Sequence, residues 1–331
     1  MTDIKFTIDD NSNALKFQQL VDAILDAISR DQLKAGEMLP SVNQIMKESN
    51  LSRDTVFKAY AELKKRGIVE SVPNRGYFVT KKITKVFLFL DTFKAYKEVL
   101  YGSFLKHLPK NIGVDLHFHH YNINMFEKIV LESLGKYSKY VIMSFDHVKI
   151  PEILQKIPAD QLLIIDWKIH SKENQSVVYQ DFGKPVYNCL KSNLEKIRQY
   201  NEFIFYYPEF TYHSKDSIVY FRKFCEDFSI KHSVIFEEDQ FRIKKGALYF
   251  LVSDRTLAGL LDQCAEKGYE PGREVGVISY NETPMKKYVK NGISVISTDF
   301  ELMGQKAAEF VTTGSFINFE VPTTLKLRSS L

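Results

Sequence analysis

Residues 16–79 constrain the fold of this chain most strongly, because three helical segments and two short strands follow one another there with their own boundary signals. A first helix is predicted from near Ala14, since apolar residues recur at helical spacing in Phe17, Leu20, Val21, Ile24, Leu25 and Ile28. Ser41 and Gln44 form an S-x-x-Q capping box, in which Ser41 accepts a free N–H and Gln44 reaches back, so a second helix begins there. Ser52 is the N-cap of a third.

The third predicted helix has one apolar and one exposed face. We expect four residues to point inward: Val56, Ala59, Tyr60 and Leu63. We expect five to remain outside: Arg53, Asp54, Phe57, Lys58 and Ala61. Gly67 ends this helix because it tolerates the left-handed conformation, and strands at residues 69–72 and 77–80 then flank Pro73-Asn74-Arg75-Gly76 as a hairpin wing. The pattern predicts an α+β winged helix-turn-helix domain over residues 1–80.

Charge is unevenly distributed along this segment. Residues 1–52 carry five Lys or Arg and eight Asp or Glu, whereas residues 53–82 carry eight Lys or Arg and three Asp or Glu. Positive charge therefore gathers at the third helix and the wing, where a phosphate backbone would lie. Within it, Lys64-Lys65-Arg66 either contacts phosphates or is a solvated surface that complements the helix macrodipole. The whole-chain charge of +4 is too small to indicate nucleic-acid binding by itself.

This segment resembles the N-terminal domain of the GntR family of bacterial transcription regulators. The resemblance is carried by Leu39-Pro40-Ser41, Leu51-Ser52-Arg53-Asp54-Thr55-Val56, Leu63-Lys64-Lys65-Arg66-Gly67-Ile68-Val69 and Arg75-Gly76-Tyr77-Phe78-Val79. It implies that a common set of residues faces DNA: Ser41, Ser52, Arg53, Thr55, Arg75 and Gly76. Family members often carry arginine where this chain has Asn43 and Phe57. Lys58 follows Phe57, but its side chain points about 100° away from that of Phe57 around the helix. Asn43, Phe57 and Lys58 complete the predicted DNA-binding set.

These residue types suit the major groove of DNA. Arg53 can contact a guanine with two hydrogen bonds. Ser41 and Ser52, each at a helix start, can bind phosphates together with free backbone N–H groups. Phe57 either contacts a thymine methyl group or packs against the first or second helix.

Beyond a short polar linker, residues 81–84, strands and helices alternate. Strands are predicted at residues 86–90, 114–120, 140–144, 162–165, 203–206, 247–251 and 275–279. Helices are predicted at residues 97–107, 126–134, 151–156, 217–227 and 256–267. Such alternation predicts parallel α/β sheets, and two series predict two Rossmann-like lobes within residues 85–331. A ligand would lie between the lobes, at the carboxyl ends of the strands.

Several other chemistries lack their sequence signals. There is no GxGxxG, GxxxxGK[ST] or G-x-S-x-G motif, which argues against nucleotide-using enzymes and α/β-hydrolases. Cys189, Cys225 and Cys264 form no CxxC pair, so we expect neither a zinc finger nor a disulfide. There is no secretory signal pattern and no apolar run of the roughly 20 residues that a membrane span requires. We expect a soluble, cytoplasmic chain without a cofactor or a membrane partner.

Residues 85–331 resemble the type I periplasmic-binding-protein-like effector domain of LacI-type regulators. The resemblance is carried by residues 253–259, 268–272, 275–282, 296–299, 303–308 and 327–330, and Val178-Tyr179-Gln180-Asp181 matches the start of a helix where the chain first crosses between lobes. It implies crossings near residues 181, 298 and 321, a sugar effector, and a homodimer on operator DNA. A GntR-type head on such a domain is similar to composite arabinose- or fucose-responsive regulators, although no LacI-type hinge helix is evident.

A sugar site needs an aromatic platform and polar groups for the hydroxyls. Trp167, the only tryptophan, follows Asp166 at a strand end and is either a stacking platform or a buried or rim aromatic. Other candidates follow strand ends or match ligand positions of the family: Asp91, Phe93, Tyr96, Asp254, Asn281 and Glu282. The family usually has an acid at Asn281 and often an arginine at Ser217, and we expect His213 and Lys215 to replace that arginine.

Three histidines on one predicted strand, His117, His119 and His120, raise the question of a metal site. Two of them share a strand face, but no cysteine or carboxylate stands at ligand spacing. We therefore expect surface or half-buried histidines and no metal.

The sequence thus predicts a ligand-responsive DNA-binding regulator with a monosaccharide effector, fucose-like or arabinose-like. It should act as a homodimer on a partly palindromic operator. Two alternatives remain open: a second domain that only dimerises, and a catalytic α/β domain behind a regulator head. Aminotransferase-fused GntR relatives have a longer second domain and no catalytic constellation is evident, so we expect no enzyme.

Overall fold

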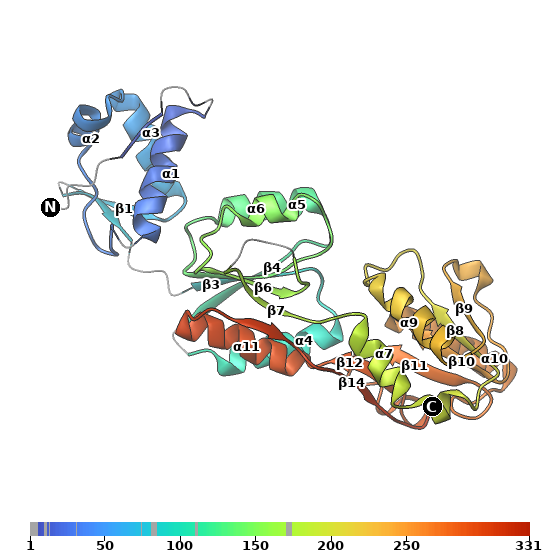
Figure 1. Cartoon of the computed structure of the whole chain (residues 1–331). Coiled ribbons are helices and arrows are strands. Elements are labelled where there is room, and N and C mark those ends of the chain that lie inside the picture. Colours follow the sequence, from blue (N-terminus) through green and yellow to red (C-terminus); the bar gives the residue numbers. More distant parts are fainter. Residues whose placement is uncertain are drawn as a thin grey trace.

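The structure is a computed structural model that describes residues 6–9, 12, 14–30, 32–73, 75–80, 85–109, 112–169 and 174–331. Three bodies follow one another along the molecule: an N-terminal domain and two α/β lobes (Figure 1). The predicted fold class, a winged helix-turn-helix followed by a two-lobed α/β domain, is confirmed. The predicted linker at residues 81–84 lies outside the described residues.

The N-terminal domain consists of three helices and a hairpin: α1 (Lys16–Ser29), α2 (Val42–Ser49), α3 (Arg53–Lys65), β1 (Val69–Val72) and β2 (Gly76–Val79). The two strands pair antiparallel, with Val72 opposite Gly76. Helix α1 begins at Lys16 rather than near Ala14, because the backbone of Leu15, with φ −58° and ψ 133°, is not helical.

Local signals set the starts of α2 and α3. Ser41 Oγ accepts the backbone N–H of Gln44 at 3.1 Å, and Ser52 Oγ accepts that of Thr55 at 3.2 Å. The predicted return contact of the capping box does not form, because the Gln44 side-chain amide donates to Glu48, one turn on, at 3.0 Å. The serine caps alone therefore satisfy the helix starts.

The end of α3 and its inward face also follow the sequence. Gly67 adopts φ 71°, and the N–H groups of Gly67 and Ile68 donate to Lys64 O and Leu63 O at 2.9 and 3.0 Å, a Schellman arrangement. The four residues predicted to face inward are all fully buried: Val56, Ala59, Tyr60 and Leu63. They share one hydrophobic core with the apolar face of α1, which leaves the opposite face of α3 in solvent.

The first lobe contains a six-stranded parallel sheet in the order β13-β7-β6-β5-β3-β4. Its strands are β3 (Lys85–Leu90), β4 (Gly113–Phe118), β5 (Lys139–Met143), β6 (Leu162–Asp166), β7 (Ser176–Tyr179) and β13 (Asn318–Glu320). Two helices cover each face, α4 (Ala95–His107) with α11 (Phe300–Thr313), and α5 (Ile123–Ser133) with α6 (Ile150–Leu154) (Figure 1). Coverage on both faces explains the continuous apolar runs of the central strands.

The second lobe contains another six-stranded sheet, in the order β14-β12-β11-β10-β8-β9. Its strands are β8 (Glu202–Tyr206), β9 (His232–Ile235), β10 (Ala247–Leu251), β11 (Gly276–Tyr280), β12 (Ser294–Thr298) and β14 (Thr323–Lys326). Its helices are α7 (Lys184–Lys191), α8 (Leu194–Ile197), α9 (Asp216–Asp227) and α10 (Asp254–Lys267), with short 3-10 turns at Glu238–Gln240 and Val289–Asn291. Strand β14 departs from the predicted parallel pattern, because it pairs antiparallel with β12.

Among the described strands, the chain passes from one sheet to the other after β7, after β12 and after β13. The expectation that residues 178–181 start a helix is wrong. Val177 and Val178 pair with Ile164 and Ile165 of β6, so this segment ends a strand, and α7 begins only at Lys184.

The N-terminal domain meets the first lobe at the amino ends of its strands. An added Cβ at Gly135, in the turn before β5, would lie 2.6 Å from Leu25 Cδ2 and 3.0 Å from Ile68 Cδ1. A cavity of about 1000 Å³ opens beside this contact, between α1 and residues 134–140. The head therefore lies at the opposite end of the first lobe from the carboxyl ends of the strands.

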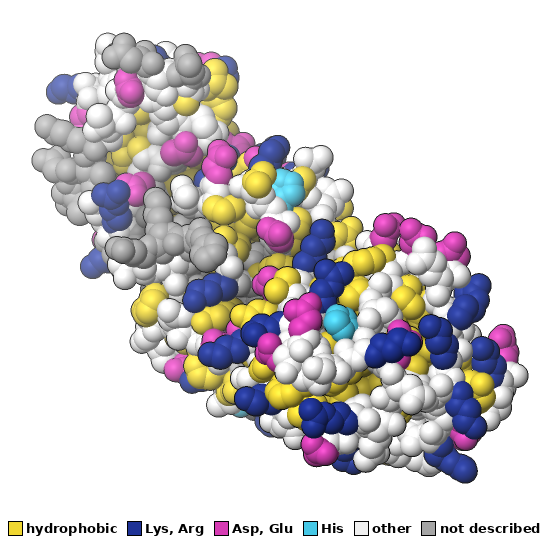
Figure 2. Space-filling model, turned by 45° about the vertical axis from the view of Figure 1, so that its right-hand side comes forward, with side chains coloured by type: hydrophobic (Ala, Val, Ile, Leu, Met, Phe, Trp, Pro, Cys, Tyr) yellow, Lys and Arg dark blue, Asp and Glu magenta, His cyan; other side chains and the backbone are white. Residues whose placement is uncertain are grey.

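Figure 2 shows Lys and Arg side chains scattered over the visible face of the two lobes, with acidic side chains between them. That face of the lobes therefore carries no continuous patch of positive charge. Of the helices that the structure describes, none is both long and apolar enough to cross a bilayer.

Candidate DNA-binding surface and interlobe site

The first turns of α3 present an exposed arginine on the surface. The Arg53 guanidinium has no carboxylate partner within the part of the chain that the structure describes, and its central carbon lies 5.6 Å from the centroid of the Phe57 ring. Phe57 is 40% exposed and is not one of the buried residues of the domain's hydrophobic core. The pair forms a cation–π contact on the outer face of the helix.

The neighbouring polar groups of α3 satisfy one another. Lys58 Nζ lies 2.9 Å from Asp54 Oδ2, so the positive charge of Lys58 is partly offset. The hydroxyls of Ser52 and Thr55 are hydrogen-bonded at 2.8 Å. These contacts hold the helix start in one geometry and leave Arg53 as its unpaired charge.

The remaining predicted DNA-facing residues also lie on the surface. Ser41 and Asn43 are exposed at the start of α2. In the wing, Arg75 and Gly76 are exposed, and the Arg75 guanidinium carbon lies 5.4 Å from the centroid of the Phe78 ring. The wing therefore repeats the arginine-on-phenylalanine arrangement of α3.

In the first lobe, Asp91 follows β3 at its carboxyl end and is buried in an ion pair with Lys97. The Tyr121 hydroxyl donates to the other carboxylate oxygen. Burial lowers the pKa of Lys97 to about 8, and the carboxylate of Asp166 partly offsets that effect. Asp91 is thus engaged by three side chains of its own lobe, those of Thr92, Lys97 and Tyr121.

Gln180, directly after β7, connects the two lobes. Its amide group donates to Asp166 at the end of β6, and its Oε1 accepts the Tyr280 hydroxyl at 3.2 Å and Thr298 Oγ1 at 2.6 Å. Burial raises the pKa of Asp166, while the Lys97 ammonium and the Gln180 amide act to lower it. These side chains form a buried polar network whose members come from both sheets.

Tyr96 and Asn281 also meet across the lobes. Burial raises the pKa of Tyr96, the charges of Asp166 and Asp254 raise it further, and a hydrogen bond from the Asn281 side chain acts in the opposite direction. Asn281 adopts φ 59° in the loop after β11. The structure therefore brings three of the predicted ligand-binding residues, Tyr96, Asp254 and Asn281, to one place.

Four buried side-chain atoms of the described residues have no hydrogen-bond partner: Ser144 Oγ, His213 Nε2, Ser279 Oγ and Asn281 Oδ1. Ser144 and Asn281 follow β5 and β11, and His213 lies in the loop between β8 and α9. Burial lowers the pKa of His213 to about 3, and its ring meets that of Tyr280 at 4.4 Å between centroids. Three orphaned atoms thus lie in loops that leave the carboxyl ends of strands, where ligand hydroxyls would supply partners.

Trp167 occupies a rim position. Its half-buried ring packs against Phe182 with centroids 4.9 Å apart, and it borders the hydrophobic core of the second lobe. The ring therefore joins the end of β6 in the first lobe to the start of the second lobe, which agrees with the rim alternative.

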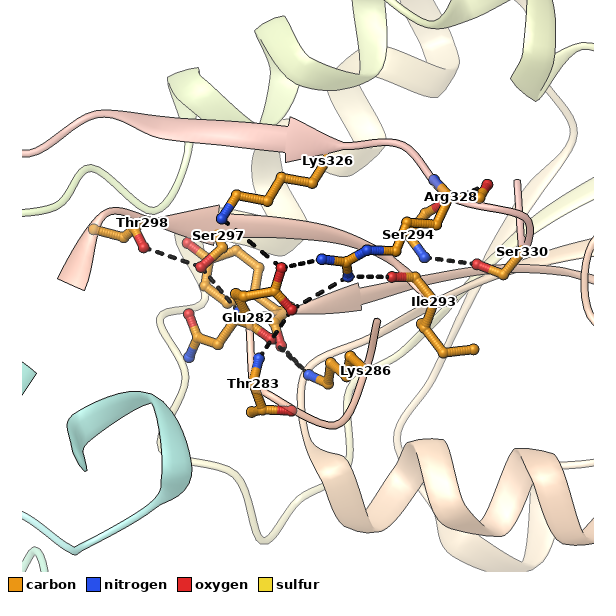
Figure 3. Close-up of polar contacts among 12 residues, drawn as sticks. Glu282, Thr283, Lys286, Ile293, Ser294, Ser297, Thr298, Lys326, Arg328 and Ser330 are labelled. Carbon is orange, nitrogen blue, oxygen red and sulfur yellow. Dashed lines mark hydrogen bonds and ion pairs between the residues drawn. The ribbon is translucent and has the colours of Figure 1, made fainter. Parts of the chain in front are cut away.

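Glu282 is engaged by the C-terminal segment (Figure 3). The Arg328 guanidinium donates to both carboxylate oxygens, and Lys326 Nζ lies 3.8 Å away. The backbone N–H of Glu282 donates to Ser297 Oγ at 2.9 Å. These contacts fasten the loop after β11 to β12 and β14, so the Glu282 carboxylate is already occupied.

Lys286 holds the same loop from inside the second lobe. Its buried ammonium donates to Tyr280 O at 2.9 Å and Asn281 O at 2.6 Å, and it pairs with Asp254 at 2.9 Å. Burial lowers the pKa of Lys286, and the Asp254 carboxylate opposes that shift. The position of Asn281 is therefore set from its backbone as well as its side chain.

Two other predicted residues lie outside the buried network. Phe93 is 50% exposed and meets Tyr101 and Phe118 edge-on. Lys215 is exposed at the start of α9. Neither residue is part of the buried contacts between the lobes.

Sequence reasoning missed several members of the interlobe site. Tyr121 and Tyr212 stack across the lobes with centroids 3.8 Å apart, and Lys97, Gln180 and Thr298 belong to the polar network. Both tyrosines stand in loops that follow strands, β4 and β8, and that position was a usable signal. Lys97 had none, because a lysine on a helix is ordinarily solvated.

The expectation that the strand histidines are exposed or half-buried is wrong for His119. Strand β4 ends at Phe118, and His119 is fully buried beyond it. Its Nε2 lies 3.0 Å from Met143 O and its Nδ1 accepts the Tyr121 N–H at 3.2 Å, so both ring nitrogens are used. Burial lowers the pKa of His119 to about 4, which keeps the ring neutral. No cluster of three or more potential metal ligands occurs among the described residues.

Comparison with protein families divides the chain in the same way as the fold. Residues 16–79 match the family described as bacterial regulatory proteins, gntR family. Residues 200–330 match a periplasmic binding protein-like domain.

Two relatives from Bacillus subtilis match the N-terminal part. The uncharacterized HTH-type transcriptional regulator YhcF is 32% identical over 98 residues, which is 30% of this chain and 78% of YhcF. The uncharacterized HTH-type transcriptional regulator YcxD is 34% identical over 70 residues, which is 21% of this chain but only 16% of YcxD. The chain therefore spans a small part of YcxD and most of YhcF.

Among solved structures, the trehalose repressor from Escherichia coli is similar in fold, with a TM-score of 0.63 and 12% sequence identity. The match covers 73% of this chain and 100% of the repressor chain. At this identity the similarity concerns the fold of the two lobes.

Proposed function

Since the chain belongs to the GntR family of bacterial regulatory proteins and carries a periplasmic-binding-protein-like domain, we propose that it is a transcription regulator whose affinity for operator DNA depends on a small molecule bound between its lobes. The observation that carries this proposal is the buried network around Gln180, which joins the two lobes at the carboxyl ends of their strands. A ligand that enters there has to replace some of those bonds, and so it changes how the lobes meet.

The DNA partner is an operator duplex, read by the start of α3 in the major groove and by the wing. The proposed contact set comprises Ser41, Asn43, Ser52, Arg53, Thr55, Phe57, Lys58, Arg75 and Gly76. Its support is the exposure of this surface and the presence of serine-capped helix starts, which favour phosphate. We expect a homodimer on a partly palindromic site, because one small domain buries too little surface for tight binding. A chromosomal partner implies that the protein works in the cytoplasm.

The effector is a monosaccharide, with fucose-like and arabinose-like sugars as the favoured class. The orphaned polar atoms of Ser144, His213 and Asn281 support a ligand rich in hydroxyls. The trehalose repressor, which has a similar fold, is named after a disaccharide, and this supports the broader class of sugars. Asp91, Tyr96, Trp167 and Asp254 would border the ligand, and Phe93, Lys215 and Glu282 stay as outer candidates.

A thermal-unfolding screen of the full chain with fucose, arabinose, rhamnose, ribose and their phosphates tests the sensor role. A ligand at about one hundred times its Kd adds about 2.7 kcal/mol to the free energy of unfolding. Ser144→Ala should reduce this gain with little effect on the ligand-free protein, because its hydroxyl has no partner to lose. Ser315→Ala is the matched control, because Ser315 is an exposed serine just beyond the end of α11.

Operator DNA selected from random duplexes by the full chain tests the DNA role separately. If DNA is bound but no sugar alters either the melting temperature or the DNA affinity, the second domain serves only to dimerise. If purified protein consumes a sugar, the domain is catalytic and the sensor proposal fails.

A further inference from the structure

The start of α3 contains a charge that the protein does not use internally. Asp54 is paired with Lys58, and the hydroxyls of Ser52 and Thr55 are bonded to each other. Arg53 has no carboxylate partner among the residues that the structure describes, and its contact is with a ring. A guanidinium that is desolvated on one side by a phenyl ring and open on the other is prepared for a flat, bidentate partner.

Phe57 holds Arg53 in place without consuming its hydrogen-bonding capacity. The ring lies one turn beyond Arg53, with the guanidinium carbon 5.6 Å from its centroid. An arginine side chain has about 2 kcal/mol of rotamer entropy, and a ring contact reduces the part of it that is lost on binding. Phe57 itself remains 40% exposed, so part of its ring is open to a partner.

The spacing of the two side chains matches neighbouring base pairs. Four residues of α-helix advance about 6 Å, and successive base pairs are about 3.4 Å apart along each strand. When the guanidinium of Arg53 lies on a base edge, the free edge of Phe57 falls within two base pairs of it. In the major groove the apolar group available to a phenyl ring is the thymine methyl, and the bidentate acceptor for arginine is guanine O6 and N7.

We propose that Arg53 and Phe57 act as one reading unit that selects a guanine with a thymine methyl within two base pairs of it. This inference rests on the proposed DNA-binding function. In the unit, Arg53 supplies the hydrogen bonds to guanine, and Phe57 supplies both the apolar contact to thymine and the restraint on Arg53. In the wing, the Arg75 guanidinium carbon lies at a similar distance, 5.4 Å, from the centroid of the Phe78 ring.

The test uses the full-length protein and the operator that it selects from random duplexes. Replacing thymine by deoxyuridine near the guanine removes one methyl group and leaves every hydrogen bond in place. Wild-type protein should bind the thymine duplex about fourfold more tightly, the value expected for burying one methyl group. Phe57→Ala should bind both duplexes equally. Phe57→Leu should keep part of the methyl preference, since it keeps an apolar side chain.

A second substitution in the DNA tests the restraint on Arg53. Replacing guanine by 7-deazaguanine removes N7, and should weaken wild-type binding by about tenfold. Phe57→Ala should show a smaller loss, because its arginine is no longer held in the bidentate position. Phe57 is exposed, so circular dichroism of both variants should match the wild type.

The outcomes separate this inference from the proposed function. A wild-type protein that binds thymine and deoxyuridine duplexes equally, or a Phe57→Ala variant that keeps the full preference, overturns the reading unit while operator binding stands. Failure to select any duplex overturns both.

Discussion

The ring of Tyr212 in the second lobe lies flat on the ring of Tyr121 in the first, with centroids 3.8 Å apart and an angle of 4° between the planes. The Tyr121 hydroxyl also donates to Asp91. One side chain in the loop after β4 is therefore connected both to the buried ion pair of its own lobe and to the opposite lobe. Tyr212 remains 59% exposed, so the stack closes the outer edge of the interlobe site.

Tyr212→Ala should loosen the closure of the two lobes. An aromatic pair contributes about 0.5–1.5 kcal/mol beyond its buried area. The free energy of unfolding of the two-lobed domain, measured in urea, should fall by a comparable amount in this variant. Tyr288→Ala is the matched control, because Tyr288 is an exposed tyrosine of the same lobe that contacts no ring of the first lobe among the residues that the structure describes. Equal stabilities for the two variants would show that the stack does not hold the lobes together.

Gln180→Leu should be one of the most damaging single substitutions in the two-lobed domain. It removes the shared partner of Asp166, Tyr280 and Thr298, and a buried polar group left unsatisfied costs about 1–3 kcal/mol. Thr298 keeps its hydrogen bond to Thr323 Oγ1 at 2.8 Å, so the cost comes mainly from Asp166 and Tyr280. Gln305→Ala, on the exposed side of α11, should change stability by less than about 0.5 kcal/mol. Denaturant unfolding of both variants at neutral pH measures the difference, and a mild effect of Gln180→Leu would contradict the bridging role.

His119 should make the protein less stable in mild acid. Its folded-state pKa is lowered by burial to about 4, whereas an unfolded histidine titrates near 6.5. Between these values the unfolded chain binds a proton that the folded chain does not, so stability is present above about pH 6.5 and is lost as the pH falls towards 4. His213, with a pKa lowered to about 3, acts in the same direction.

The free energy of unfolding of wild type and His119→Gln, measured from pH 7 to pH 4.5, checks this effect. His119→Gln should show a shallower decline, because glutamine can hydrogen-bond but cannot titrate. His147→Gln, at a half-buried histidine of the same lobe, is the control for the substitution itself. If the free energies of unfolding of His119→Gln and the wild type fall in parallel, His119 is not the source of the lost stability in acid.

Arg53→Ala should lower specific DNA binding far more than non-specific binding. Losing a bidentate contact to guanine removes about 1–3 kcal/mol of discrimination. Lys64→Ala should instead weaken both kinds of binding to the same extent and reduce the salt dependence, if Lys64 contacts phosphate. Titrations of the selected operator and of a scrambled duplex at two salt concentrations distinguish these cases, and equal losses for Arg53→Ala would contradict base recognition.

Trp167 should report ligand binding by fluorescence. It is the only tryptophan of the chain, and it packs on Phe182 where the first lobe joins the second. A sugar that raises the melting temperature by binding between the lobes should also shift Trp167 emission. The Trp167→Phe variant, which keeps an aromatic ring, serves as the blank. A stabilising sugar that leaves the emission unchanged would have to bind elsewhere.

The elements that the sequence predicted well are those controlled by neighbours in the chain. Ser41 and Ser52 cap α2 and α3 through N–H groups three residues away, and Gly67 ends α3 through bonds to carbonyls three and five residues back. The apolar runs of β3, β5 and β6 were recognisable because a strand covered on both faces needs no polar side. Strand β4 was predicted to run two residues past its actual end at Phe118, since His120 and Tyr121 turn the chain with φ 49° and 58°.

The sequence by itself determined the head, its exposed reading face and the class of the domain behind it, because caps, periodicity and apolar runs act over a few residues. Only the tertiary structure decided the partners of the polar residues. The sequence does not indicate that Arg328 pairs with Glu282. Nor does it indicate that Gln180 accepts hydrogen bonds from Thr298 and Tyr280 of the other lobe. Such pairings form when burial forces distant polar groups to satisfy one another, and no short stretch of chain records which groups will meet.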